Sequence, residues 1–237
     1  MRNSKSLLKM ITLSMLIALG VVISPILRVE GMCPMAHFIN ILCSVFLGPW
    51  YSLLCATLIG IIRMLTMGIP PIALTGAIFG AFLSGVFYRL SKGRIIFAVL
   101  GEIIGTGIIG AIISYPVMTF LWGKEGLSWL FYVPSFICGT LIGGSIAYVF
   151  LRKFASNGML AKVQTMLGAT GYTDRSTLLS NTITIAALGG ILFVVFELAT
   201  DIFSLTAPLW DHMSYISLVL CGAGAVIYYI TKKVKTH

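Results

Sequence analysis

Charged residues are scarce in this 237-residue chain. Asp, Glu, Lys and Arg together make up 10% of it, 58% of the residues are hydrophobic, and the mean hydropathy is +1.02. Soluble domains carry about 25% charged residues. The shortage of charge therefore excludes a soluble catalytic domain and indicates an integral membrane protein. The net charge of +9 is then explained by basic loops that face an anionic membrane surface, without a nucleic-acid partner.

Motifs of catalysis are also missing. The sequence contains no His-Glu-x-x-His zinc motif, no Gly-x-Ser-x-Gly nucleophile elbow and no Walker sequence. The glycine-rich segment Gly101–Ala111 is not a phosphate loop, because no strand precedes it and no Lys-Ser/Thr follows it. Five cysteines, an odd number, provide no disulfide framework. We therefore expect that this chain is not an enzyme.

Apolar stretches that could cross a membrane occur eight times, since a spanning helix needs about 20 residues. The predicted spans are Leu7–Leu27, Met35–Leu47, Pro49–Thr66, Pro71–Leu90, Ile95–Leu121, Trp129–Leu151, Leu179–Ala199 and Met213–Ile230. The second is short for a full crossing. The polar stretch between the sixth and seventh spans is expected to hold a surface helix or a linker. The fold class is thus an all-α membrane protein with a six-helix core (1–153), a connecting segment (154–178) and a two-helix C-terminal extension (179–237).

Loop charges predict the orientation of these spans. If the amino terminus is cytoplasmic, 13 of the 16 Lys and Arg residues fall on the cytoplasmic side. The three exceptions are Arg28, Arg63 and Lys124. Because cytoplasmic loops are enriched in Lys and Arg, this distribution predicts that both termini are cytoplasmic.

Small residues four positions apart mark several predicted helix faces. Such pairs occur at Gly76/Gly80, Gly101/Gly105 and Gly139/Gly143. They let helices approach closely in lipid, so we predict tight helix–helix packing there. The first span carries Ser14 and Ala18 at the same spacing. This face is a candidate for docking another membrane subunit.

Polar side chains inside the spans are candidates for a binding site, because they are costly in lipid. His37 and Asn40 are three residues apart near the outer end of the second span and share one helix face. Both donate and accept hydrogen bonds, as needed to orient a small heterocycle in an apolar pocket. The alternative is that they only satisfy neighbouring backbone groups.

Three further residues are more ambiguous. Arg63, near the outer end of the third span, is interpreted as snorkelling to the interface, with ligand contact as the alternative. Glu102 lies about 10 Å from the cytoplasmic end of its helix and must be paired, protonated or facing a cavity. Ligand contact and structural hydrogen bonding are both open for it. Tyr115, followed by Pro116, combines an aromatic side chain with a backbone break.

Two other chemistries are disfavoured. Cys33 and His37, with Met32 and Met35 nearby, offer soft metal ligands, but two good ligands do not complete a tetrahedral site. We therefore predict no metal site. A membrane enzyme that uses Glu102 and His37 is disfavoured because the two are predicted to lie toward opposite membrane faces, whereas an acid and a base must both reach the reacting atom.

Taken together, these motifs resemble the ThiW family, the substrate-binding (S) components of energy-coupling factor (ECF) transporters for hydroxyethylthiazole, a thiamine precursor. The resemblance covers about residues 1–153 and leaves the tail without an assigned function. It departs from the family at Ser14, where Ala is common, and at Leu74-Thr75, where relatives have Phe-Pro. The matching residues are Cys33-Pro34, His37, Ile39-Asn40, Leu47-Gly48-Pro49-Trp50-Tyr51, Arg63, Gly76-Ala77, Gly80-Ala81, Tyr88-Arg89, Gly101–Gly107 and Tyr115-Pro116.

The resemblance implies a multi-pass protein of a bacterial cytoplasmic membrane that binds a vitamin precursor near its outer face, with the loop from Arg28 to Pro34 taking part in capture. A transmembrane coupling protein and two cytosolic ATPases would be its partners, so ATP would be used by those subunits and no cofactor is expected in this chain. The coupling protein would meet the face that carries Ser14 and Ala18. Substrate-binding residues are expected among Cys33, His37, Asn40, Arg63, Glu102 and Tyr115.

The residues also favour one ligand over others. The outer half of the core supplies His, Asn, Tyr and Trp but, on this interpretation, no buried acidic group. A neutral thiazole alcohol needs stacking and a few hydrogen bonds, whereas cationic thiamine favours an anionic or π-rich cage. Hydroxyethylthiazole is therefore preferred, and thiamine, another vitamin or a transition metal ion remain alternatives.

Overall fold

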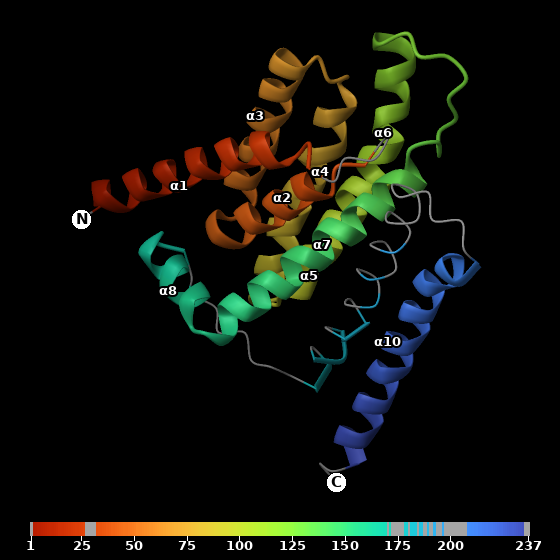
Figure 1. The fold of residues 1–237 in the computed structure, drawn as a ribbon. Helices are drawn as coiled ribbons and strands as arrows, with labels where there is room; N and C mark the ends of the chain where they lie inside the picture. The colour runs from red at the N-terminus through yellow and green to blue at the C-terminus, as the bar shows by residue number, and fades with distance from the viewer. Residues whose placement is uncertain are drawn as a thin grey trace. The chain divides into compact units, whose positions relative to one another are not determined.

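The computed structural model describes residues 2–26, 32–169, 171, 178–179, 181–183, 185–186, 189, 192, 196 and 208–234. Internal contacts divide the chain into two compact units, Met1–Asp174 and Arg175–His237 (Figure 1). The first unit contains every predicted site residue. Each unit is described by itself.

The first unit is built of helices. Among its described residues, five helices are long and apolar enough to cross a membrane, and α2 is a shorter apolar helix. The helices are α1 (Arg2–Ile23), α2 (Pro34–Leu47), α3 (Pro49–Met67), α4 (Ile72–Leu90), α5 (Ile95–Glu102), η1 (Ile103–Gly110), α6 (Ala111–Pro116), η2 (Val117–Leu121), α7 (Val133–Ser156) and α8 (Met159–Met166). The all-α membrane fold and the short second helix are thus confirmed.

One continuous helix runs from Ile95 to Leu121 and is wider than an α-helix in two places. The segments η1 and η2 are π-helical, with hydrogen bonds from residue i to residue i+5. Pro116 ends α6 and lacks the N–H of a regular turn. Glu102 is therefore the last residue of a regular α-helical segment and directly precedes a π-helical one.

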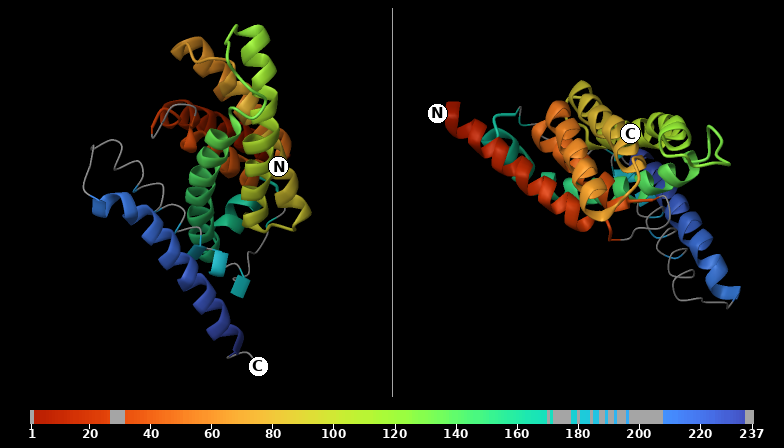
Figure 2. Two further views of the ribbon diagram at one scale, coloured as in Figure 1. Left: turned by 90° about the vertical axis from the view of Figure 1, so that its right-hand side faces the viewer. Right: turned by 90° about the horizontal axis from the view of Figure 1, so that it is seen from above.

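Helix α4 packs against this long helix through glycines, and α7 covers its other side (Figures 1 and 2). A Cβ added at Gly105 would lie 2.5 Å from the Cα of Gly80, and one at Gly110 would lie 2.8 Å from the carbonyl oxygen of Gly76. No side chain larger than hydrogen fits at such contacts. The predicted close packing at these small residues is confirmed.

The turn between α2 and α3 depends on Gly48, whose φ is +93°. A side chain at this position would be strained and would also meet the guanidinium of Arg89. Pro49 then begins α3 at the first helical position, where its missing N–H costs nothing. The two helices are consequently joined with a single residue between them.

Helix α8 occupies the stretch where a surface helix was expected. The amide nitrogen of the buried Gln164 donates to the Val45 carbonyl and to the Tyr88 hydroxyl, both at 2.9 Å. Leu160 on the same helix is buried as well. This helix therefore closes the end of the first unit at which α2 and α4 end.

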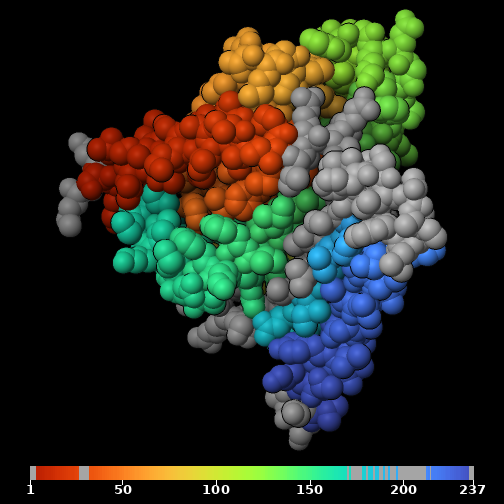
Figure 3. All heavy atoms as spheres, in the orientation of Figure 1, coloured from red at the N-terminus to blue at the C-terminus, as the bar shows by residue number. Residues whose placement is uncertain are grey.

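Helix α1 lies at the surface of the first unit (Figure 3). Ser14 and Ala18, on its predicted docking face, are both exposed, and so are several large apolar side chains of α1, including Met15 and Val22. Apolar exposure of this kind suits contact with lipid or with another membrane protein.

The second unit contains α10 (Pro208–Val234), which includes the predicted span Met213–Ile230. The predicted span Leu179–Ala199 lies largely outside the described residues; its described positions are helical. Within this unit, the Asn181 amide donates to the Tyr228 hydroxyl at 3.1 Å.

Candidate functional site

Glu102 is the centre of a buried polar cluster. One carboxylate oxygen, Oε1, lies 2.9 Å from Nδ1 of His37 and accepts hydrogen bonds from Nδ2 of Asn40 at 3.0 Å and from Oγ1 of Thr106 at 3.2 Å. The four side chains, called the Glu102 cluster below, come from α2, α5 and η1 and are all at least nine-tenths buried. The contact with Glu102 engages Nδ1 of the imidazole and so fixes the orientation of the ring.

The second oxygen of this carboxylate, Oε2, is buried and has no hydrogen-bond partner among the described residues. Gly80 faces it: a Cβ at Gly80 would lie 2.9 Å from Oε2 and would overlap Oγ1 of Thr106. The absent side chain of Gly80 therefore makes the space that the cluster occupies. A buried carboxyl group needs its hydrogen bonds, so the three partners of Oε1 are what keep it in this position.

This cluster overturns the prediction that Glu102 and His37 lie toward opposite membrane faces. His37 is ten residues before the end of α2 at Leu47, or about 15 Å along the axis, and Glu102 is seven residues after the start of α5 at Ile95, or about 11 Å. Because these helix ends belong to the same side, the two residues differ in depth by only about 4 Å. The argument against an enzyme that uses His37 and Glu102 was therefore wrong.

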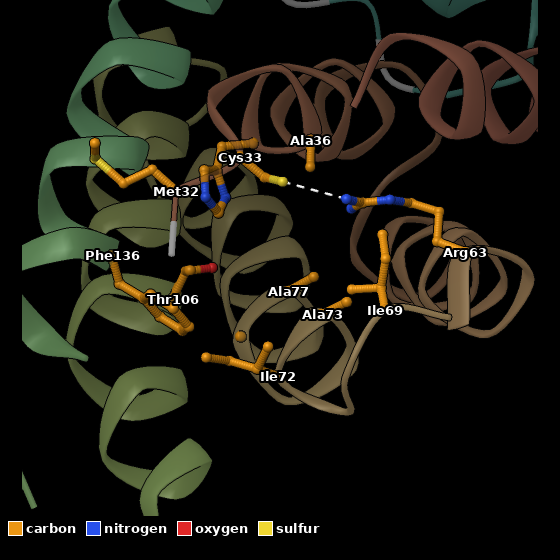
Figure 4. Close-up of a pocket in the computed structure, with 12 residues that line it drawn as sticks. Met32, Cys33, Ala36, Arg63, Ile69, Ile72, Ala73, Ala77, Thr106 and Phe136 are labelled. Carbon is orange, nitrogen blue, oxygen red and sulfur yellow. Dashed lines mark hydrogen bonds between the residues drawn. The ribbon is translucent and has the colours of Figure 1, made fainter. Parts of the chain in front are cut away.

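A cavity adjoins the cluster at the end of the first unit where α2 begins and α3 ends (Figure 4). It offers about 80 Å³ to the centres of water-sized molecules, several times the 10–15 Å³ or so that a single water needs. Its wall is mostly apolar. The lining residues are Met32, Cys33, Ala36, His37, Arg63, Ile69, Ile72, Ala73, Gly76, Ala77, Thr106 and Phe136.

His37 and Thr106 belong both to the cavity wall and to the Glu102 cluster. Since Nδ1 of His37 is held by Glu102, the other ring nitrogen, Nε2, is the one left for a bound molecule. Asn40 and Glu102 do not line the cavity, so they act on its contents through His37 and Thr106. A buried acid, which the sequence-based choice of ligand left out of account, thus contacts two residues of the cavity wall.

Arg63 does not snorkel, contrary to the preferred interpretation of its sequence position. Its side chain is 3% exposed and lines the cavity. Its Nη2 donates to Sγ of Cys33 at 3.2 Å, and its Nε is buried without a hydrogen-bond partner among the described residues. The wall thus contains a buried cation in contact with a thiol.

Tyr115 is not among the residues that line this cavity. Its ring centroid lies 4.5 Å from that of Trp129, which is exposed. The structure therefore brings together Cys33, His37, Asn40, Arg63 and Glu102 but places Tyr115 elsewhere.

Thr106 and Phe136 were missed from the sequence. Thr106 had a usable signal, because it follows the buried acid by four residues on a helix and so shares its face. Phe136 had none, since nothing in its local sequence separates it from the other apolar residues of α7. Its ring lies against Gly76, where a Cβ would be 2.7 Å away.

Metal ligands do not gather in the part of the chain that the structure describes. No group of three or more His, Cys, Asp or Glu side chains is placed there to hold a metal ion, and Cys33 and His37 meet only as two residues of the cavity wall.

The model of the thiamine-precursor transporter proteins, ThiW, matches residues 10–157. The chain belongs to the ThiW family. This match runs from α1 to the end of α7 and contains the whole Glu102 cluster and all the cavity residues. A search of curated proteins and a search of solved structures gave no significant match. Membership of a transporter family, together with the apolar helices, makes this chain a multi-pass membrane protein that serves transport of a small molecule.

Proposed function

We propose that this ThiW protein is the S component of an ECF transporter and captures hydroxyethylthiazole from outside the cell. A coupling protein and two cytosolic ATPases would then drive its import. The observation that carries the proposal is the cavity itself: a small, mostly apolar space with His37, Thr106, Arg63 and Cys33 on its wall. Sites for small molecules are typically built in this way, with few polar groups that fix orientation.

The size of the cavity supports a ligand with a single small ring. In this arrangement the thiazole packs against Phe136 and the aliphatic wall, and its heteroatoms meet Nε2 of His37 and the hydroxyl of Thr106. Asn40 and Glu102 are positioning residues, because their contacts with each other and with His37 fix the imidazole without reaching the cavity.

Capture from outside follows from the predicted orientation. With both termini in the cytoplasm, the end of the first unit that contains the cavity faces the exterior. The exposed Ser14 and Ala18 on α1 are proposed to meet the coupling protein, because small exposed residues let another helix approach closely.

Thiamine is the second candidate ligand, and one observation favours it. Glu102 supplies a buried carboxylate with an unpartnered Oε2 close to the cavity wall, which removes the objection that the site lacks an anion for a cationic ligand. The small volume favours the thiazole alone. Calorimetric competition between hydroxyethylthiazole and thiamine, with nickel and cobalt as further competitors, separates the candidates.

Binding calorimetry on the purified chain tests the proposal. We expect saturable binding of hydroxyethylthiazole without ATP, and a weakening of about 1 kcal/mol or more in His37→Ala and in Asn40→Ala, because each change strands a buried partner. His212→Ala and Asn157→Ala, which remove exposed side chains of the same types, serve as matched controls. Absence of saturable binding to the wild-type chain would overturn the proposed function.

A further inference from the structure

Polar side chains lie at two opposite sides of the cavity. Arg63 lies on one side, Thr106 and Phe136 lie across from it, and Cys33 lies above and between them with its sulfur toward Arg63 (Figure 4). The side chains of Ile72, Ala73 and Ala77 line the space below and between them. A bound molecule that reaches both sides must therefore carry polar atoms at two separated positions.

The guanidinium of Arg63 has unused hydrogen-bonding capacity. It carries five N–H donors in a planar fork. Among the described residues, it forms one bond, to Cys33, its Nε has no partner, and no carboxylate lies within salt-bridge distance. A buried cation whose acceptor is a thiol sulfur is poorly satisfied, so this group is poised for an oxygen acceptor that enters the cavity.

From this we infer that Arg63 and Cys33 form a subsite for an oxygen-bearing arm of the ligand, while the ring binds on the side of Thr106 and Phe136. The inference rests on the proposed function and specifies which side chains recognise the hydroxyl-bearing arm of the ligand. A hydroxyl fits the pair because it accepts from an N–H of the Arg63 guanidinium and at the same time donates to, or accepts from, the thiol of Cys33. The positive charge of Arg63 disfavours an ammonium arm in the same place.

Three synthetic thiazoles with the same ring test the inference. They carry a hydroxyethyl, an ethyl or an aminoethyl arm, and their dissociation constants are measured on the full-length protein. We expect the alcohol to bind about tenfold more tightly than the ethyl compound, as for one hydrogen bond to a charged group, and the aminoethyl compound to bind more weakly than the ethyl one.

The variant Arg63→Met removes the donor fork and retains much of the side-chain volume. It is expected to reduce the preference for the alcohol over the ethyl compound to about twofold or less, with the affinity for the ethyl compound nearly unchanged. Arg94→Met, at an exposed arginine, is the matched control and keeps the full preference. If Arg63→Met kept the preference, or lost affinity for both compounds to the same degree, the inference would be wrong.

The outcomes also separate this inference from the proposed function. If the wild-type protein binds none of the thiazoles, the proposed function fails and the subsite with it. If it binds the alcohol and the ethyl compound equally, or binds the aminoethyl compound best, the subsite alone is refuted. These comparisons use the unaltered protein, so they decide the matter even if Arg63→Met does not fold.

Reactivity of Cys33 gives a second readout. The alcohol is expected to slow alkylation of Cys33 by a small maleimide several-fold more than the ethyl compound does at equal occupancy. Labelling is measured in a background with Cys138→Ser and Cys221→Ser, because Cys138 is exposed and Cys221 is half-buried like Cys33, and Cys33→Ser identifies the labelled site. Equal protection by both compounds would contradict contact between the hydroxyl and the thiol.

Discussion

Replacement of Gly80 by Ala tests whether the Glu102 cluster depends on the close approach of α4 and η1. The added methyl would overlap Oγ1 of Thr106 and would lie 2.9 Å from both Cδ and Oε2 of Glu102. The backbone offers no relief, because η1 already touches Gly80 at Gly105. Either Thr106 turns away and its hydrogen bond to Glu102 breaks, or the two helices separate.

Both routes have an expected cost. Loss of a hydrogen bond to a carboxylate costs about 1.5–3 kcal/mol, and an extra methyl in a packed interface costs about 1–3 kcal/mol. Since one route or the other suffices, we expect Gly80→Ala to lower the free energy of unfolding by about 1–3 kcal/mol. Because Thr106 lines the cavity, affinity for hydroxyethylthiazole should fall as well.

The assay is denaturant unfolding in mixed micelles, followed by calorimetry with the ligand. Gly222→Ala is the matched control: Gly222 also lies within a helix, but a Cβ there meets nothing within 4 Å. That change should be neutral or stabilising by up to about 1 kcal/mol.

A double-mutant cycle identifies the clash. In a Thr106→Ala background the overlap with Oγ1 is gone, so Gly80→Ala should cost at least about 1 kcal/mol less than it does in the wild-type protein. If Gly80→Ala unfolds like the wild type and binds ligand within twofold of it, or if the cycle shows no coupling, the packing argument is refuted.

Three further predictions concern the rest of the first unit. Gln164→Leu should destabilise the protein by about 1–3 kcal/mol in the same unfolding assay, because it removes two buried hydrogen bonds that hold α8; an unchanged midpoint would show that α8 is not held in this way. In whole cells, an impermeant maleimide should label Lys124→Cys and not Arg94→Cys, and the reverse pattern would invert the predicted orientation. Ser14→Leu and Ala18→Leu should keep ligand affinity and reduce co-purification of the coupling protein, and retained co-purification would exclude this face as the docking surface.

Hydrophobic length and spacing were enough to predict most of the fold. The spans follow from apolar runs, and the tight contacts at Gly76, Gly80 and Gly105 follow from small residues four positions apart. The π-helical segments η1 and η2 were not predicted, because a shift from i+4 to i+5 hydrogen bonding leaves no pattern in the apolar residues.

The candidate site was predicted in part. Cys33, His37 and Arg63 line the cavity, and Asn40 and Glu102 support it. The approach of Glu102 to His37 was not recognised, because the depth of each residue was counted separately from the nearest end of its own helix. The burial of Arg63 depends on how α3 packs against its neighbours, which the sequence around Arg63 does not reveal.

The glycine contacts between α4 and η1 have a consequence for ligand entry. With backbone against backbone, these two helices cannot move closer together, so the cavity wall that they form at Gly76 and Thr106 cannot close further around a ligand. Any tightening of the cavity on ligand entry is therefore expected at the opposite side, where α3 carries Arg63 and is joined to α4 by a few residues around Ile69.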